Sequence, residues 1–253
     1  DTSRSQGRLA GPRHAGEEAA HCPRRVRRTG LPGRLGPERI SAATITEQDA
    51  IEMYEDKCID MNLKKNVGAQ KRFVEQFMGS IHKKSLKLSG LGLGPGCAVR
   101  LKDLLASNRR FVFIDLSLNR LGNKGAEVLG SFISVNPGII YIDLRSNSIE
   151  TEGMKALFRG LKYNSHITDL DLSTINGIDR NKIGTPGCKE LAIVIKYNRV
   201  LANLNVATCG ITVAGCEMLG PAISRNQSLF LLDLTANRFG GEGARELFKN
   251  EGS

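Results

Sequence analysis

A short pattern that returns at a nearly constant interval constrains this chain more than any other feature. Residues 111–119 read FVFIDLSLN, and related stretches follow as far as residue 237, with a degenerate first copy at residues 85–90. The central apolar position recurs at intervals of 28, 28, 28, 34 and 28 residues. It is occupied by Leu88, Leu116, Leu144, Leu172, Val206 and Leu234. A unit this short cannot bury its hydrophobic face alone, so the period predicts a stack of repeats.

Each unit changes from strand spacing to helical spacing. Phe111, Ile114 and Leu116 are the inward residues expected of a strand, and Leu129 and Ile133 fit one face of the helix that follows. A small or slim residue that follows a glycine is expected to start each helix; these residues are Ala126, Met154, Cys188, Cys216 and Ala244, after Gly125, Gly153, Gly187, Gly215 and Gly243. An asparagine is expected at each helix C-terminus because asparagine tolerates left-handed backbone angles. These are Asn108, Asn136, Asn164, Asn198 and Asn226.

The basic charge of the chain is concentrated in its first part. Residues 1–40 carry nine Arg and four acidic residues, whereas the rest of the chain has 27 basic and 22 acidic residues. Residues 1–44 are rich in Arg, Gly, Pro and Ala without apolar periodicity, so we predict a disordered basic arm. A mitochondrial transit peptide stays open, although three glutamates argue against it. Nucleic acid is expected only as a non-specific contact of this arm.

Residues 45–84 are predicted to form a helical cap at the first repeat. Thr46 can cap a helix whose first turn carries Glu47 and Asp49. Its apolar face holds Ala50, Ile51, Tyr54, Cys58 and Met61, and a second helix is expected over residues 70–81 with Phe73, Val74, Phe77 and Ile81 inward. An open stack would expose its end layer to water, so we expect capping to be the task of these helices.

The repeated residues resemble leucine-rich repeats of the ribonuclease-inhibitor type. The resemblance covers residues 85–253, about six units with the last incomplete. It implies an α/β solenoid, a short horseshoe arc with parallel strands on the concave face and helices on the convex face. It also implies that one side chain per turn hydrogen-bonds backbone groups left unpaired by neighbouring units. That column reads Asn119, Asn147, Asn181, Cys209 and Asn237.

A second, weaker resemblance concerns the segment before the repeats. Tyr54, Cys58 and Asn62 at four-residue spacing look like the leaders of some intracellular repeat proteins, including ciliary and flagellar ones. This resemblance implies that the protein is located in the cytoplasm, in the cytoskeleton or in a cilium.

Partner-binding residues are expected where strand side chains point away from the core. Two columns of such positions are acidic at the centre with an aromatic flank: Phe113, Asp115, Tyr141, Asp143, Asp169, Asp171, Asn205 and Asp233. An aspartate here is also common where a strand position is merely solvated. The interval of 34 residues adds an inserted loop at residues 174–180, with Ile175, Ile178 and Arg180 as contact candidates. The loop could equally be a tolerated insertion.

No catalytic, cofactor-binding or metal-binding residue can be assigned from the sequence. The six cysteines contain no C-x-x-C pair, the four histidines are scattered, and the run GLGLGPG at residues 90–96 has no phosphate-loop ending. The cysteines are interpreted as reduced and buried, and no apolar run is long enough for a membrane span. We therefore expect a non-enzymatic protein-binding scaffold or subunit of a multi-subunit assembly. A GTPase activator and a ribonuclease inhibitor or receptor sensor remain the alternatives.

Overall fold

The computed structural model describes residues 44–175 and 177–249, and the predicted basic arm lies outside them apart from Thr44. Two helices, α1 (Glu47–Asp60) and α2 (Val67–Gly79), precede six strand–helix units. The strands are β1 (Ser85–Lys87), β2 (Phe113–Asp115), β3 (Tyr141–Asp143), β4 (Asp169–Asp171), β5 (Asn203–Asn205) and β6 (Leu231–Asp233). The unit helices are α3 (Pro95–Ser107), α4 (Gly122–Val135), α5 (Thr151–Tyr163), α6 (Gly184–Tyr197), α7 (Val213–Ser224) and α8 (Gly240–Leu247).

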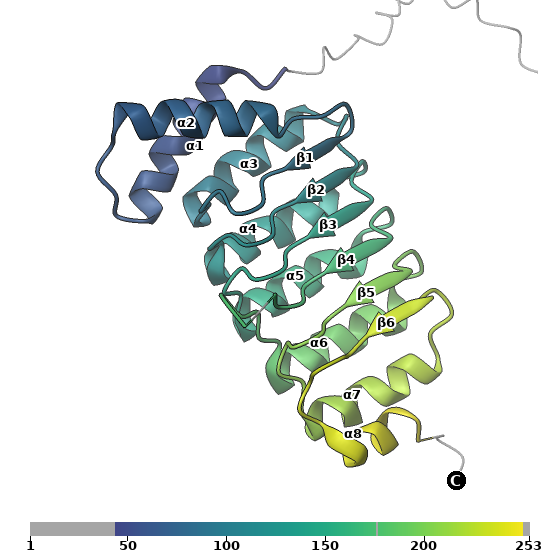
Figure 1. Ribbon diagram of the computed structural model, residues 1–253. Coiled ribbons are helices and arrows are strands. Elements are labelled where there is room, and N and C mark those ends of the chain that lie inside the picture. Colours follow the sequence, from purple (N-terminus) through teal and green to yellow (C-terminus); the bar gives the residue numbers. More distant parts are fainter. Residues whose placement is uncertain (1–43, 176, 250–253) are drawn as a thin grey trace, which may run out of the picture. The chain divides into compact units, whose positions relative to one another are not determined.

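The strands form one parallel sheet in the order of the sequence (Figure 1). Equivalent residues of neighbouring units pair in register; Ile114 pairs with Ile142 and Leu170 with Leu204, across the long interval. Each unit helix packs against the helix of the next unit. The expected α/β leucine-rich-repeat solenoid is confirmed, and the six extra residues leave the register of the sheet unchanged.

The core is a single column of apolar side chains that runs through every layer. The middle residue of β2, Ile114, is buried between half-buried neighbours, which is the alternation predicted for a strand with one face inward. Leu116, Leu144 and Leu172 are each at most 1% exposed. Because the sheet supplies one residue and the helix another in every unit, burial repeats with the sequence period.

The predicted turn column is confirmed by its hydrogen bonds. The Asn119 amide nitrogen donates to the carbonyl oxygens of Leu88 and Leu116, and its oxygen accepts from the Leu93 backbone at 2.9 Å. Asn181 and Asn237 bind backbone groups of the preceding unit in the same way. Carbonyl and amide groups inside a buried turn have no water to bind, so this side chain satisfies them instead.

The predicted helix starts are wrong by about one turn. Helix α4 begins at Gly122, not at Ala126, and Gly125 lies inside its first turn. A Cβ added at Gly125 would stand 2.9 Å from the Leu121 Cβ, and one at Gly243 only 2.4 Å from the Phe239 Cβ. The glycine column is therefore required by close packing against the apolar residue that enters each helix.

The asparagines at the helix ends are also present for a different reason than predicted. Asn136, Asn164 and Asn198 have extended backbone angles, with φ between −79° and −71°. The Asn164 oxygen accepts from the backbone of His166 and Ile167, while its nitrogen donates to the Ile133 carbonyl of the preceding helix. The column thus links consecutive helix ends, and the left-handed positions fall elsewhere, at residues such as Leu118 and Thr208.

The two leading helices pack on the first repeat. Thr46 caps α1 as predicted, and Asp49 completes a capping box with it, whereas α2 begins three residues earlier than predicted, with Asn66 as its cap. Asp60, the last residue of α1, accepts hydrogen bonds from the first-turn nitrogens of Gly96 and Cys97 in α3. Arg100 of α3 pairs with Glu52 and Asp56 of α1.

The outer edge of β1 is occupied by the chain that leads into it. The backbone nitrogen of Lys87 donates to the Ser80 carbonyl, and the backbone nitrogen of His82 donates to the Ser85 carbonyl. These two hydrogen bonds lie on either side of the β-bridge between Ile81 and Leu86. Because these groups are already paired, another strand cannot add to the sheet at this edge without displacing them.

Candidate functional site

The candidate site is the sheet face that the unit helices do not cover, here called the open sheet face. It is formed by the first and third residues of each strand. In chain order these are Ser85, Lys87, Phe113, Asp115, Tyr141, Asp143, Asp169, Asp171, Asn203, Asn205, Leu231 and Asp233. The register of the sheet places equivalent members side by side, as the sequence predicted.

Two aromatic rings form a stacked pair on this face. Phe113 of β2 and Tyr141 of β3 have ring centroids 4.3 Å apart and nearly parallel planes. Burial, followed by the negative charge of Asp143, raises the pKa of Tyr141 to about 12. The phenol is therefore neutral at physiological pH. The two half-buried rings present a rigid apolar surface to a partner.

The acidic column has a structural task that the sequence did not reveal. At the end of the strands β2 to β6 the side chain accepts a hydrogen bond from the backbone nitrogen two residues later: Asp115 from Ser117, Asp143 from Arg145, Asp171 from Ser173, Asn205 from Ala207 and Asp233 from Thr235. Aspartate and asparagine favour such turns because the short side chain reaches its own backbone. Their recurrence is thus explained by turn closure, whether or not a partner binds.

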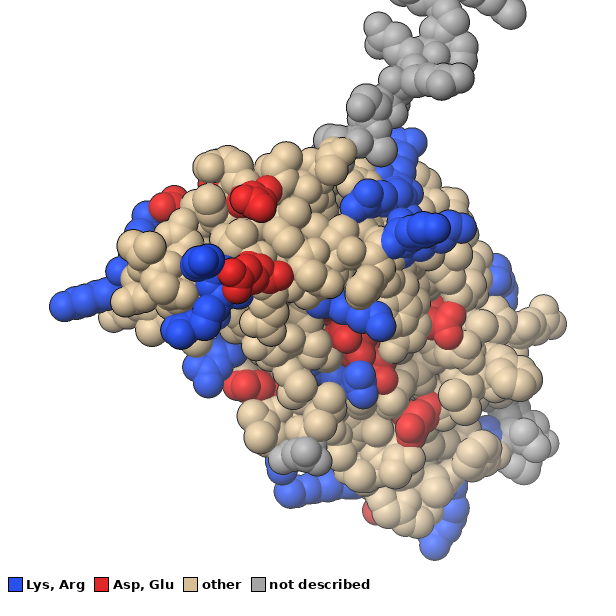
Figure 2. Space-filling model, turned by 45° about the horizontal axis from the view of Figure 1, so that its top comes forward, with Lys and Arg blue, Asp and Glu red and all other residues tan. Residues whose placement is uncertain are grey.

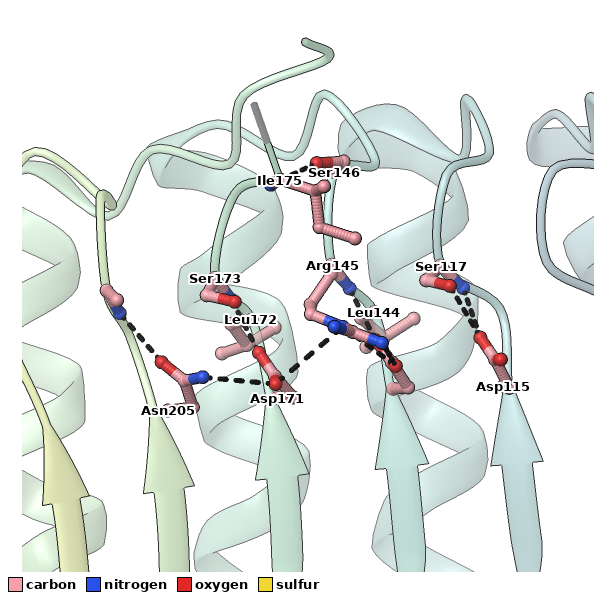
Figure 3. Close-up of polar contacts among 12 residues, drawn as sticks. Asp115, Ser117, Leu144, Arg145, Ser146, Asp171, Leu172, Ser173, Ile175 and Asn205 are labelled. Carbon is pink, nitrogen blue, oxygen red and sulfur yellow. Dashed lines mark hydrogen bonds and ion pairs between the residues drawn. The ribbon is translucent and has the colours of Figure 1, made fainter. Parts of the chain in front are cut away.

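Arg145 changes the electrostatics at the centre of the face. Its guanidinium donates two hydrogen bonds of 2.9 Å to Asp143 and stands 3.7 Å from Asp171 (Figure 3). Asp143 is only 2% exposed, and burial raises the pKa of its carboxyl while the bonds from Arg145 oppose that rise. The hydrogen bonds to Asp143 in turn raise the pKa of Arg145. The more exposed side chain there is therefore Arg145, and the expectation of an exposed carboxylate at Asp143 is wrong.

Arg145 was missed because it lies one position beyond the strand column. The equivalent residues are Ser89, Ser117, Ser173, Ala207 and Thr235, so an arginine in this row occurs once. The occurrence of an arginine in only one unit was the signal that the sequence offered. A long basic side chain two residues after an inward-bent aspartate can fold back over it.

The exposed negative charge is instead greatest one strand later. Asp169 and Asp171 lie on β4, where Asp169 accepts from the Asn203 side chain at 2.6 Å and Asp171 from the Asn205 side chain at 3.1 Å. A hollow of about 180 Å³ lies here, lined also by Tyr141 and by Leu231, which is 55% exposed. Asp171 also closes its own turn, whereas the carboxylate of Asp169 accepts from the side chains of Asn203 and Thr168.

The inserted loop is bound to the turn of the preceding unit. The Ile175 nitrogen donates to the Ser146 hydroxyl at 2.8 Å (Figure 3). The Ser148 nitrogen donates to the Asp179 carbonyl at 2.9 Å. Ile175 is half-buried and Ile178 is 61% exposed, while the Arg180 side chain bonds back to the Gly177 carbonyl. The predicted exposed apolar contact therefore reduces to Ile178.

Charge and chemistry on the rest of the described chain are mixed. Figure 2 shows basic and acidic side chains adjacent to each other in the middle of the face drawn. Within residues 44–175 and 177–249, no three His, Cys, Asp or Glu side chains are grouped to hold a metal ion, and none of the helices there is long and apolar enough to cross a membrane. Five cysteines are free and buried; burial raises the pKa of Cys97 and of Cys188 to about 12.

Comparison with known proteins places three units in a repeat family. A leucine-rich repeat model matches residues 108–130, 136–158 and 225–248, which include β2, β3 and β6. No curated protein matches the chain. These units are leucine-rich repeats, while the ribonuclease-inhibitor type and the ciliary relationship stay predictions.

Two solved structures illustrate the similarity. The tropomodulin C-terminal domain of Caenorhabditis elegans is 12% identical, with a TM-score of 0.47 over 62% of this chain and 92% of that chain. Leiomodin-1 actin-binding site 2 is 22% identical, with a TM-score of 0.48 over 56% of this chain and 80% of that chain.

Proposed function

We propose that this chain is a non-enzymatic protein-binding module, a scaffold or a structural subunit of a larger assembly. Its main contact surface is the open sheet face. The observation that carries the proposal is the juxtaposition of the stacked Phe113–Tyr141 pair with the hollow at Asp169 and Asp171. Rigid aromatic rings are typical of the residues that dominate protein interfaces, and the hollow beside them combines leucine side chains with carboxylates and amides.

The partner segment that fits this face is basic. Across its strand positions the open sheet face carries one lysine, Lys87, and five aspartates, of which Asp143 is neutralised by Arg145. Arg145 itself shows how a guanidinium binds there, between the carboxylates of two neighbouring strands. One strand along, β4 carries both Asp169 and Asp171, and Ser173 takes the place of the arginine, so a partner's arginine or lysine can pair with Asp169 beside the Asp171 carboxylate that Arg145 approaches.

The strands alone are too small for a stable interface. Six strands about 4.8 Å apart, each about 10 Å long, span roughly 240 Å², against about 800 Å² per partner in a standard interface. A partner must therefore extend over the turns at the strand ends. On that edge the loop at residues 174–180 offers Ile178 and Arg180, which we include in the proposed surface, while the half-buried Ile175 holds the loop against the preceding turn.

A photo-crosslinking residue placed at position 113 tests the proposal. It is compared in cells with the same residue at position 127, an exposed glutamate on α4. Proteins captured from position 113 are identified by mass spectrometry, and their affinity is measured for Phe113→Ala and Asp169→Lys. Asp169 is chosen because its carboxylate accepts from the side chains of Thr168 and Asn203, so its replacement spares the turn backbone.

The proposal expects both variants to lose at least tenfold in affinity, with the matched charge change Glu127→Lys leaving affinity unchanged. Crosslinks that form only from position 127 would overturn it. So would full affinity in Phe113→Ala and Asp169→Lys while circular dichroism shows both variants folded.

A further inference from the structure

A second surface lies on the helix side of the stack, away from the open sheet face. A groove of about 350 Å³ runs between α6 and α7. Its apolar lining is formed by Ala192, Ile193, Met218, Pro221 and Ala222. Met218 is 37% exposed, although methionine side chains are usually buried. Pro221 lies inside α7 and has no N–H to donate to the Glu217 carbonyl.

The rim of this groove is basic. Lys189 and Lys196 line it from α6 and Arg225 from the end of α7, against one acidic residue, Glu217. The two lysines are seven residues apart, about 10 Å along the helix, and so mark two levels of the same groove. At the lower level, formed by the helix C-termini, the lining residues Lys196 and Arg225 are both cations.

Aromatic side chains extend this surface past the groove. Tyr197 at the end of α6 is 55% exposed, and the equivalent Tyr163 at the end of α5 is 72% exposed. The Lys196 nitrogen stands 5.2 Å from the Tyr197 ring, and Lys162 stands 5.0 Å from the Tyr163 ring and 5.6 Å from the Tyr197 ring. Cations at a helix C-terminus are favoured by the helix dipole alone, but that effect does not account for exposed tyrosines beside them or for the apolar floor.

We propose that the groove between α6 and α7 binds an amphipathic helix of a partner protein, with one apolar ridge flanked by Asp or Glu. Two parallel helices leave a furrow that accepts the side-chain ridge of a third helix. The apolar floor takes the ridge, and Lys189, Lys196 and Arg225 pair with the acidic flanks. The sign is opposite to that of the open sheet face, so one molecule can hold a basic and an acidic partner on separate surfaces.

Designed peptides test this with the whole chain. The probe is a fluorescent 18-residue helical peptide with isoleucines at positions i, i+4, i+7 and i+11 and glutamates beside them. One control peptide replaces these glutamates by lysines, and another replaces the isoleucines by glutamines. By fluorescence anisotropy, the glutamate peptide is expected to bind at least tenfold more tightly than either control.

Two variants locate the binding. Ala192→Trp fills the floor and should reduce affinity for the glutamate peptide at least tenfold; Ile193→Gln is the second variant if the tryptophan impairs folding. Lys189→Glu with Lys196→Glu should invert the preference, so that the lysine peptide binds better. Lys124→Glu, an exposed change on α4, should alter nothing.

Three outcomes overturn the proposal. One is equal affinity for the glutamate and lysine peptides, or no measurable binding of either. Another is binding that Ala192→Trp and Ile193→Gln both leave unchanged. The third is binding of phosphatidylserine vesicles, or self-association in sedimentation, that the groove variants abolish while the glutamate peptide does not bind.

Discussion

The middle layers of the stack and the last layer are built from the same residue types but are buried to different degrees. Leu144 of the β3 unit is fully buried, whereas the equivalent Leu234 of the β6 unit is only partly buried. Phe230 and Leu231 beside it are 91% and 55% exposed. The pattern in the sequence is equal in the two layers, so a repeat gains its stability from neighbours on both sides.

The largest difference in unfolding free energy is expected when the central leucine of a unit is truncated. Leu144→Ala should cost about 2 to 5 kcal/mol of unfolding free energy, because it leaves a cavity between two packed layers. Leu172→Ala in the β4 unit should cost the same. Leu234→Ala should cost less than half as much, since its side chain is already partly solvated. Urea denaturation followed by circular dichroism gives the three values; equal costs would refute the comparison.

The turn asparagines give a second, smaller contrast. Asn119→Ala removes the partners of the Leu93 nitrogen and of the Leu88 carbonyl inside a buried turn, while the Leu116 carbonyl keeps the Asn147 amide as a partner. Each buried group left unpaired costs about 1 to 3 kcal/mol, so a loss of about 3 kcal/mol is expected in urea denaturation. Asn237 is half-buried, and water can replace it, so Asn237→Ala should cost about 1 kcal/mol.

The ion pair of the middle layers predicts a pH dependence. In Arg145→Met the hydrogen bonds that oppose the raised pKa of Asp143 are lost, so that pKa rises further. An aspartate whose folded pKa exceeds its unfolded value destabilises the fold once it ionises. The loss from Arg145→Met should therefore be greatest at pH 7, about 1 to 2 kcal/mol given that the arginine is one third exposed, and should shrink toward pH 4.

Ser117→Ala serves as the control for that experiment, because its site holds no buried cation–carboxylate pair. Thermal denaturation of both variants from pH 4 to pH 7 measures the effect. If the cost of Arg145→Met stays constant across this range, Asp143 does not titrate as its burial implies.

The smallest effect is expected in the inserted loop. Ile178 is 61% exposed, so Ile178→Ser should change the unfolding free energy by less than about 0.5 kcal/mol. Ile175→Ser should cost more, because Ile175 is half-buried over the preceding turn. Differential scanning calorimetry measures the stability of both variants. If neither substitution changes it, Ile175 does not hold the loop against the preceding turn.

Much of the architecture could be predicted from the sequence because the same pattern of residues occurs in six units. Spacing predicted the strands, the inward leucines and the unbroken register across the insertion, and the resemblance to leucine-rich repeats predicted the role of the turn asparagines. The sequence also identified Thr46 as the N-cap of α1, since such signals act within one helical turn. A local pattern of residues that recurs at a fixed interval allows the elements and the core positions to be predicted without a structure.

What only the tertiary structure decided is which side chains and backbone groups meet, within a unit as well as between units. The glycines are explained by a side chain that approaches each of them, the helix-end asparagines by carbonyls of the preceding helix, and the acidic column by turn closure. Arg145 removes Asp143 from the surface, and the groove between α6 and α7 arises from two helices that the sequence separates. The pattern in the sequence specifies which residues face inward. Which outward residues meet one another depends on side-chain orientation and on the packing of neighbouring layers, because the spacing along the chain does not fix either.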